Sequence, residues 1–109
     1  MKLLTRNQIE SIKENYPLIP DEYLSWITDN GWGEDESGYM IYSSPAYSTE
    51  IFGTDCPENI KSVVLVGDDM AGYSIGYKVI SDKAQLVGID SCGWDVEEIQ
   101  KSFDEYLES

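Results

Sequence analysis

The chain has 109 residues, of which 21 are acidic, seven are basic and none is histidine, so its formal net charge is −14. This charge repels nucleic acid and anionic membranes and attracts basic proteins, so we expect neither of the first two as a direct partner. The lack of histidine removes the usual general base near neutral pH, the Ser–His and Cys–His nucleophiles and the commonest metal ligand. We therefore predict a binding protein rather than an enzyme, and no cofactor.

One folded domain, residues 1–109, is predicted because a chain of this length forms a single core. Its residues are 41% hydrophobic and 12% aromatic, whereas disordered acidic tails are poor in aromatic and β-branched side chains. Polar residues interrupt the amino-terminal segment before a signal-peptide core forms, and the longest apolar run is too short to cross a bilayer. Cys56 and Cys92 are too few for a secreted disulfide framework, so we predict free thiols in a cytoplasmic protein.

Two helices are predicted in the first third of the chain. Thr5 and Gln8 form a capping-box pair, apolar residues follow at helical spacing, and Pro17 ends the first helix. The second helix begins at Pro20, because proline is tolerated in a first turn, and it ends at Asn30-Gly31. Its predicted apolar face consists of Tyr23, Trp26 and Ile27.

The middle of the chain has strand character. Tyr39 to Tyr42 is a short aromatic and β-branched run, which Ser44-Pro45 ends. The segment after it is ambiguous and holds at most one short strand, around Glu50-Ile51-Phe52. Val63 to Val66 is apolar throughout, which indicates a central strand covered on both faces.

Two further strands follow in an antiparallel meander. The turn of residues 68–72 leads into an alternating strand of residues 73–79, for which we expect one buried face. A turn at residues 81–83 leads to a strand from Gln85 to Asp90. These connections are too short for parallel crossovers.

A last amphipathic helix is predicted from Asp95, with Glu98 at the capping-box position. Its apolar positions recur at helical spacing: Val96, Ile99, Phe103, Tyr106 and Leu107. The predicted fold class is therefore α+β, with a single antiparallel sheet flanked by N-terminal helices and this C-terminal helix.

Some residues could form a metal, phosphate-binding or catalytic site, but each of them also has a simpler interpretation. Asp68, Asp69 and Asp90 are possible Mg²⁺ ligands, but adjacent aspartates in a turn more often accept local backbone hydrogen bonds. The glycines between residues 67 and 76 join strand to strand, so they lack the helix N-terminus that a phosphate loop requires. A carboxylate-based or metal-dependent enzyme is the least favoured hypothesis, since it needs a buried carboxyl or converging ligands.

An acidic surface is the favoured site, although each of its residues also fits a solvated loop. Its charged candidates are Glu34, Asp35, Glu36, Asp68, Asp69, Asp90 and Asp95. Trp32 and Trp94 are candidates for aromatic anchors, because aromatic side chains are enriched in protein interfaces. Either tryptophan is equally consistent with a core position at a tight corner.

Three segments resemble the SUKH superfamily, which groups the yeast cell-wall-assembly regulator domain with many bacterial immunity proteins. Ile19 to Leu24 running into Asn30-Gly31-Trp32-Gly33 is similar to its opening motif of a proline-led helix and an Asn-Gly corner. Val64 to Gly72 resembles its strand with a Gly/Asp-rich turn, and Ser102 to Glu108 its C-terminal helix.

The resemblance implies an α+β domain without established catalysis that in bacteria commonly binds and blocks a toxin. It agrees with the charge argument, because a nuclease surface is basic and an acidic protein can occupy it. We therefore expect an immunity-type protein that neutralises a basic toxin, of the nuclease kind, through direct contact. The alternative is a regulatory or scaffolding module that binds a cellular protein.

Overall fold

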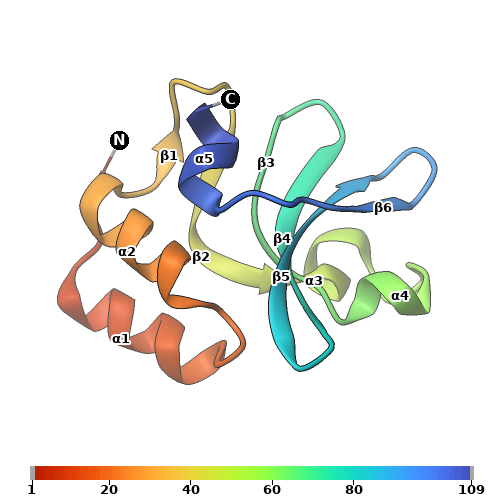
Figure 1. The fold of residues 1–109 in the computed structure, drawn as a ribbon, viewed down its shortest axis with the longest axis horizontal. Coiled ribbons are helices and arrows are strands. Elements are labelled where there is room, and N and C mark those ends of the chain that lie inside the picture. The colour runs from red at the N-terminus through yellow and green to blue at the C-terminus, as the bar shows by residue number, and fades with distance from the viewer. Residues whose placement is uncertain (1, 109) are drawn as a thin grey trace.

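The structure is a computed structural model that describes residues 2–108; Met1 and Ser109, the ends of the predicted 1–109 domain, lie outside this range. Six strands form one antiparallel meander in which each strand pairs with the next along the chain (Figure 1). Helices precede and follow the sheet, so the predicted α+β class is confirmed. The strands are β1 (Gly33–Glu34), β2 (Met40–Tyr47), β3 (Val64–Asp68), β4 (Tyr73–Ile80), β5 (Lys83–Asp90) and β6 (Asp95–Glu98).

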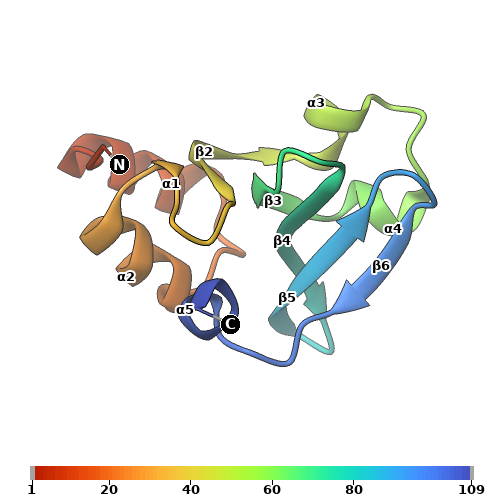
Figure 2. The same cartoon turned by 90° about the horizontal axis from the view of Figure 1, so that it is seen from above.

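One face of the sheet is covered by α1 (Arg6–Asn15), α2 (Asp21–Asn30) and α5 (Phe103–Glu108), as the view from above shows (Figure 2). The larger core lies between these helices and the sheet. Its fully buried aromatic rings are Tyr23 of α2, Tyr77 of β4 and Phe103 of α5. No helix in residues 2–108 combines the length and apolar character needed to cross a bilayer.

The ends of the first two helices follow the predicted local chemistry. The Thr5 hydroxyl accepts a bond from the backbone N–H of Gln8 at 3.2 Å, and the Gln8 side chain accepts one from the backbone N–H of Thr5 at 2.8 Å. Pro20 is the N-cap of α2 and not its first helical residue. Gly31 ends α2 at φ +81° and leaves room for the backbone of Lys2, which a Cβ would meet.

The opposite face of the sheet carries a smaller core under α3 (Ser48–Phe52) and α4 (Glu58–Lys61). Its buried members are Cys56, Ile60, Val63, Leu65, Val87 and Ile89. Val63 to Val66 is fully buried, which confirms the prediction of a central strand covered on both faces. Cys56 is a buried free thiol and Cys92 an exposed one.

Two predictions for the middle of the chain are wrong. Pro45 does not end the strand but lies within β2, where the pairing with β3 shifts register between Ile41 and Ala46. Proline is tolerated at such an irregularity because no ladder hydrogen bond is required of it. Glu50-Ile51-Phe52 belongs to the helix α3 and not to a strand, since three residues are too few to separate the two periodicities.

Strand β4 is buried differently from the prediction. Ser74 to Tyr77 is buried at every position, although one buried face was expected, and Val79 is 51% exposed. The reason is that helices cover both faces of the sheet at the middle of β4 and leave its far end uncovered. The two-residue turn at Ser81-Asp82 and the strand β5 agree with the prediction.

The predicted helix from Asp95 is also wrong. Asp95 to Glu98 is the strand β6, which pairs with β5 so that Val96 lies opposite Ile89. The C-terminal helix begins only at Phe103, after a different capping box. The backbone N–H of Ser102 donates to Glu105 Oε1 at 3.3 Å, and the backbone N–H of Glu105 donates to Ser102 Oγ at 3.2 Å.

Candidate functional site

The meander places alternate turns at the same end of the sheet. The β1–β2 loop, the β3–β4 turn and the β5–β6 turn are all at this end, in the upper half of Figure 1. All seven charged residues proposed from the sequence lie in these turns or at the strand ends beside them. We call this set the acidic end: Glu34, Asp35, Glu36, Asp68, Asp69, Asp90 and Asp95.

Strand pairing sets the order of these residues across the sheet. Glu34 lies opposite Met40, and Met40 lies opposite Asp68 on the next strand. Further along, Asp90 lies opposite Asp95. The structure therefore lines up along one end of the sheet residues that are up to 61 positions apart, with Glu34 and Asp95 on its two outermost strands.

A direct hydrogen bond joins two of the three turns. Ser91, in the β5–β6 turn, donates to the carbonyl oxygen of Gly72 in the β3–β4 turn from both its backbone N–H and its hydroxyl, each at 2.9 Å. The backbone N–H of Asp69 donates to the carbonyl of Tyr73 at 2.9 Å and closes the β3–β4 turn. The β3–β4 and β5–β6 turns are thus held in a fixed relation to each other.

Four carboxylates of the acidic end stabilise their own turns. Each accepts a backbone N–H from two residues further on, and Asp69 accepts a second one from Tyr73 at 3.0 Å. These bonds run from Ser37 to Asp35 at 3.1 Å, from Met70 to Asp68 at 2.8 Å, from Ala71 to Asp69 at 2.8 Å and from Cys92 to Asp90 at 2.9 Å. The simpler interpretation of these aspartates, as acceptors of local backbone bonds, is therefore confirmed.

The carboxylates do not gather around a common point. Within residues 2–108, no group of three or more Cys, Asp or Glu side chains has the arrangement of a metal site. Asp68 is turned toward β2, where its Oδ2 accepts the hydroxyl of Tyr42 at 2.6 Å. Asp68, Asp69 and Asp90 thus share one end of the sheet without forming a ligand cluster.

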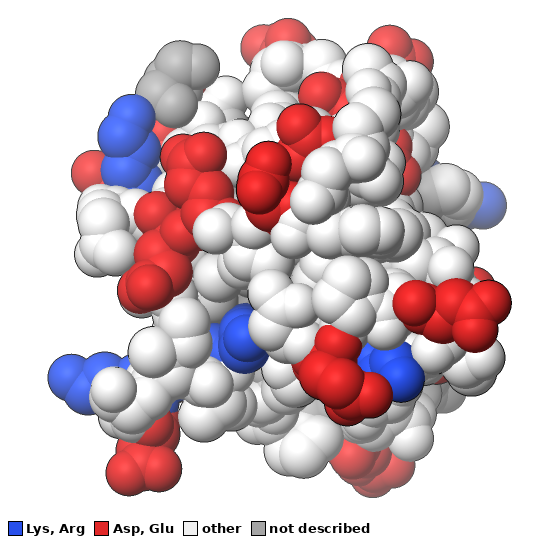
Figure 3. All heavy atoms as spheres, turned by 90° about the vertical axis from the view of Figure 1, so that its right-hand side faces the viewer, with Lys and Arg blue, Asp and Glu red and all other residues white. Residues whose placement is uncertain are grey.

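The acidic end is distinguished by its lack of neighbouring cations in the sequence. Neither residues 14–60 nor residues 84–100 contain a Lys or Arg. The ion pairs recorded for residues 2–108 lie elsewhere, between Lys13 and Glu10 on α1 and between Lys61 and Glu58 on α4. Carboxylates occur on other faces too: Figure 3, which looks onto the side of β6 and α4, shows them over the whole face, with Lys and Arg among them chiefly in its lower part.

Half-buried tyrosines lie beside the acidic end. The hydroxyls of Tyr39 and Tyr106 are 2.6 Å apart, and the two rings meet edge to face at 5.7 Å. Burial, followed by the bond to Tyr106, raises the pKa of Tyr39 above its ordinary value. Burial and then the charge of Glu97 raise the pKa of Tyr73 to about 12. These phenols therefore stay neutral and can donate hydrogen bonds at an otherwise anionic surface.

Both candidate tryptophans are half-buried. Trp32 packs against the larger core, and its backbone N–H and carbonyl pair with Lys2 at 2.8 and 3.0 Å. Trp94 packs against the smaller core, with its ring 5.1 Å from that of Phe52, and its φ of +58° closes the β5–β6 turn. Each tryptophan thus packs against a core, as one of the two interpretations expected, and keeps some exposed surface; a role as an interface anchor stays a prediction.

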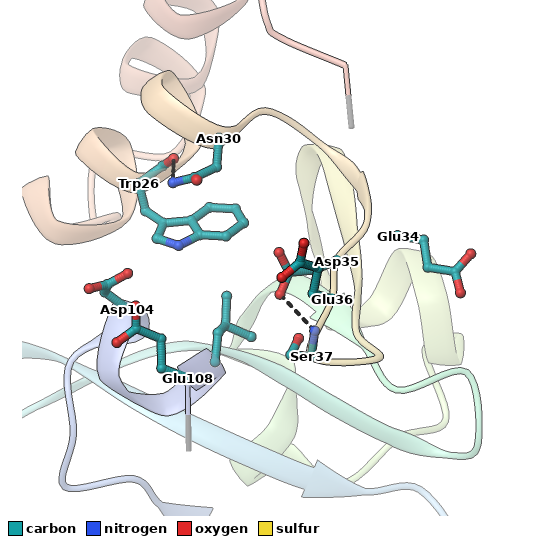
Figure 4. Close-up of a pocket in the computed structure, with 9 residues that line it drawn as sticks. Trp26, Asn30, Glu34, Asp35, Glu36, Ser37, Asp104 and Glu108 are labelled. Atoms are coloured by element: carbon teal, nitrogen blue, oxygen red, sulfur yellow. Dashed lines mark hydrogen bonds between the residues drawn. The ribbon is translucent and has the colours of Figure 1, made fainter.

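A groove of about 810 Å³ opens beside the acidic end, between the end of α2, the β1–β2 loop and α5 (Figure 4). The sequence analysis missed its half on α5. Trp26 was expected in the core, and neither Asp104 nor Glu108 was a candidate, because no local pattern signals that α2 and α5 meet. The lining residues are Trp26, Asn30, Glu34, Asp35, Glu36, Ser37, Asp104, Leu107 and Glu108.

Comparison of the chain with protein-family models, with curated proteins and with solved structures gives no match.

Proposed function

We propose that the chain is an immunity-type protein that neutralises a basic bacterial toxin, of the nuclease kind, by direct contact through the acidic end. The observation that carries the proposal is the collection of three acidic turns at one end of the sheet, with no Lys or Arg in any of them. A nuclease needs a cationic surface to hold phosphate, and a rigid array of carboxylates is complementary to such a surface.

Charged residues and buried anchors contribute differently to binding at such an interface. Exposed charges steer the encounter and set partner choice, whereas affinity comes mostly from a few desolvated anchors. Trp32, Trp94 and Tyr39 are partly exposed beside the carboxylates and are the proposed anchors. The β3–β4 and β5–β6 turns are tied to each other, which limits the conformational entropy that these two turns lose on binding.

Membership of the SUKH superfamily belongs to the same proposal and rests on the sequence motifs. The proline-led helix α2 ends at the Asn-Gly corner, and α5 buries Phe103 and Leu107 in the larger core, as the resemblance implies for those segments. A regulatory or scaffolding module of the cell-wall-assembly type is the alternative within that superfamily. Its partner would be a cellular protein instead of a toxin.

The test is the association rate with a toxin domain encoded beside the gene, measured while salt is raised from about 50 to about 500 mM. We expect the rate to fall steeply with salt and expect the protein to rescue cells that express this toxin. The double variant Asp90→Asn with Asp95→Asn removes two charges from the acidic end, and asparagine keeps an oxygen for the Cys92 N–H. It should slow association several-fold at low salt.

The matched control is Glu50→Gln with Asp55→Asn, which removes two charges from the β2–β3 connection, outside the acidic end. We expect this variant to associate almost as fast as the parent chain. Equal slowing by both double variants would mean that only net charge matters. A rate indifferent to salt and to both variants would remove the proposal.

A further inference from the structure

We propose that the groove between α2, the β1–β2 loop and α5 receives an arginine side chain of the partner, together with the backbone carbonyl beside it. This inference rests on the proposed function and assigns the groove as the place where one basic side chain of the toxin is desolvated. Two independent observations carry it: the charge of the groove walls and an unpaired donor on its inner side.

The walls of the groove are acidic on both sides. Asp35 and Glu36 from the β1–β2 loop face Asp104 and Glu108 from α5 across the groove (Figure 4). Glu34 points away and lies at the rim. No Lys or Arg is among the lining residues that the structure describes. Four carboxylates around one concave space, without a cation in it, are complementary to a single strong positive charge.

The unpaired donor is the indole N–H of Trp26. Only 8% of this residue is exposed, and its ring packs edge to face on Phe103 with centroids 5.1 Å apart. Its indole nitrogen is directed to the side of the groove where Asp104 and Glu108 lie (Figure 4), and it donates to no acceptor in residues 2–108. This N–H opens onto the groove from a side chain that is otherwise buried, and a carbonyl oxygen of a bound chain would satisfy it.

Arginine fits this combination better than lysine does. Its guanidinium is planar, presents five donors, pairs with carboxylates through two parallel bonds and stacks on aromatic rings, whereas the lysine ammonium is a strongly hydrated point charge. The groove volume of about 810 Å³ exceeds what one guanidinium fills, so the flanking backbone also enters. That backbone brings the carbonyl for the Trp26 N–H.

The wall formed by the end of α2 and the β1–β2 loop is already partly ordered. Asp35 accepts the backbone N–H of Ser37 through Oδ2 at 3.1 Å, which leaves Oδ1 for a ligand. Asn30 donates to the carbonyl of Trp26 at 2.9 Å and is held against its own helix. Ordered walls lose little entropy when a ligand enters.

The probe is a blocked Gly-Arg-Gly tripeptide titrated into the intact protein, with the indole N–H signals followed by NMR. The chain has three tryptophans and so three such signals, and Trp26→Phe identifies the one that matters. We expect the Trp26 signal to shift saturably while those of Trp32 and Trp94 do not. A blocked Gly-Lys-Gly tripeptide should bind about fivefold more weakly. Equal shifts of all three signals, or none of Trp26, would overturn the proposal.

The groove variant is Asp104→Asn with Glu108→Gln, and its matched control is again Glu50→Gln with Asp55→Asn. We expect about tenfold weaker binding of the arginine tripeptide by the groove variant and no loss by the control, which carries the same net charge. An equal loss in both would mean non-specific attraction and would overturn the proposal.

Failure of this inference can be told apart from failure of the proposed function. If Asp90→Asn with Asp95→Asn slows toxin association and the groove variant leaves the toxin affinity unchanged, the acidic end binds the toxin and the groove does not. If neither variant affects the toxin, the proposed function fails. The tripeptide titration still decides whether the groove holds arginine, since it uses no toxin.

Discussion

Tyr23 lies at the centre of the larger core, between the rings of Phe103 and Tyr77, and its side chain is fully buried. Its hydroxyl has no hydrogen-bond partner within residues 2–108. A buried polar group without a partner costs about 1–3 kcal/mol of desolvation free energy. The ring therefore stabilises the core while its hydroxyl opposes that stabilisation.

Replacing Tyr23 by phenylalanine should consequently raise the free energy of unfolding, by about 1 kcal/mol. The matched control is Tyr77→Phe, which removes the hydroxyl that donates to Glu22 Oε2 at 2.9 Å and should lower stability. Urea unfolding of both variants gives the comparison. A loss of stability in Tyr23→Phe as large as that in Tyr77→Phe would show that the Tyr23 hydroxyl is paired.

Single residues were predictable where their partners are local. Thr5 and Gln8 are three positions apart, so the capping box could be read from the sequence. Glu22, in contrast, has distant partners. Its carboxylate accepts bonds from the Tyr77 hydroxyl and from the backbone N–H of Phe103, both at 2.9 Å. Those partners are 55 and 81 positions away, beyond any local pattern.

At the scale of elements, β3 and β4 approach each other closely at Gly76. A Cβ at this position would meet the carbonyl oxygen of Val64 and lie 2.9 Å from the Cα of Leu65. Both are backbone atoms of a buried strand, so neither can move aside cheaply. Glycine is therefore required here by the spacing of the two strands.

Gly76→Ala should lower the free energy of unfolding by at least about 1–3 kcal/mol, the usual cost of overpacking a core. Gly93→Ala is the matched control, because its nearest neighbour is the exposed carboxylate of Asp95 at 3.1 Å. Thermal unfolding followed by circular dichroism measures both variants. Similar melting temperatures for the two would contradict the close approach of β3 and β4.

Local sequence patterns did not settle every element. Asp95 to Glu98 and Ser102 to Glu105 both carry a cap residue with a glutamate three positions later, and only the second pair starts a helix. The first segment is a strand because it pairs with β5, and Trp94 turns the chain back to make that pairing possible. Long-range pairing outweighs a local helix signal.

The wrong prediction of a helix from Asp95 also affects the description of the site. The sequence indicates which acidic residues are candidates, but it does not predict that Asp90 and Asp95 close a hairpin beside the β3–β4 turn. That arrangement depends on β6 being a strand. The groove depends on contact between α2 and α5, whose sequences are far apart. The charges of the site could therefore be predicted, and its shape could not.

At the scale of the whole molecule, the tyrosines set a limit on alkaline stability. Burial raises the pKa of Tyr23, Tyr39, Tyr42 and Tyr77, and it raises that of Tyr73 to about 12. In the unfolded chain these phenols lose their protons near pH 10. Above that pH the unfolded state binds fewer protons than the native state, so stability falls as pH rises.

We therefore expect the contribution of these tyrosines to the free energy of unfolding to be fully present below about pH 10 and to decline steadily toward pH 12. Phenolate absorbance should show fewer than the eight tyrosines titrating before the native state unfolds. The same titration in urea should show all of them together, which makes it the internal control. A native titration that matches the one in urea would mean that the phenols are not shielded.

The exposed edge of strand β6 affects how the protein aggregates. Strand β6 pairs with β5 alone, and three of its four residues, Asp95, Glu97 and Glu98, are exposed acids. An unpaired strand is a template on which a second copy of a protein can add. Two copies aligned along β6 would bring like charges face to face. This border therefore resists aggregation, and strong acid, which protonates the carboxylates, removes that resistance.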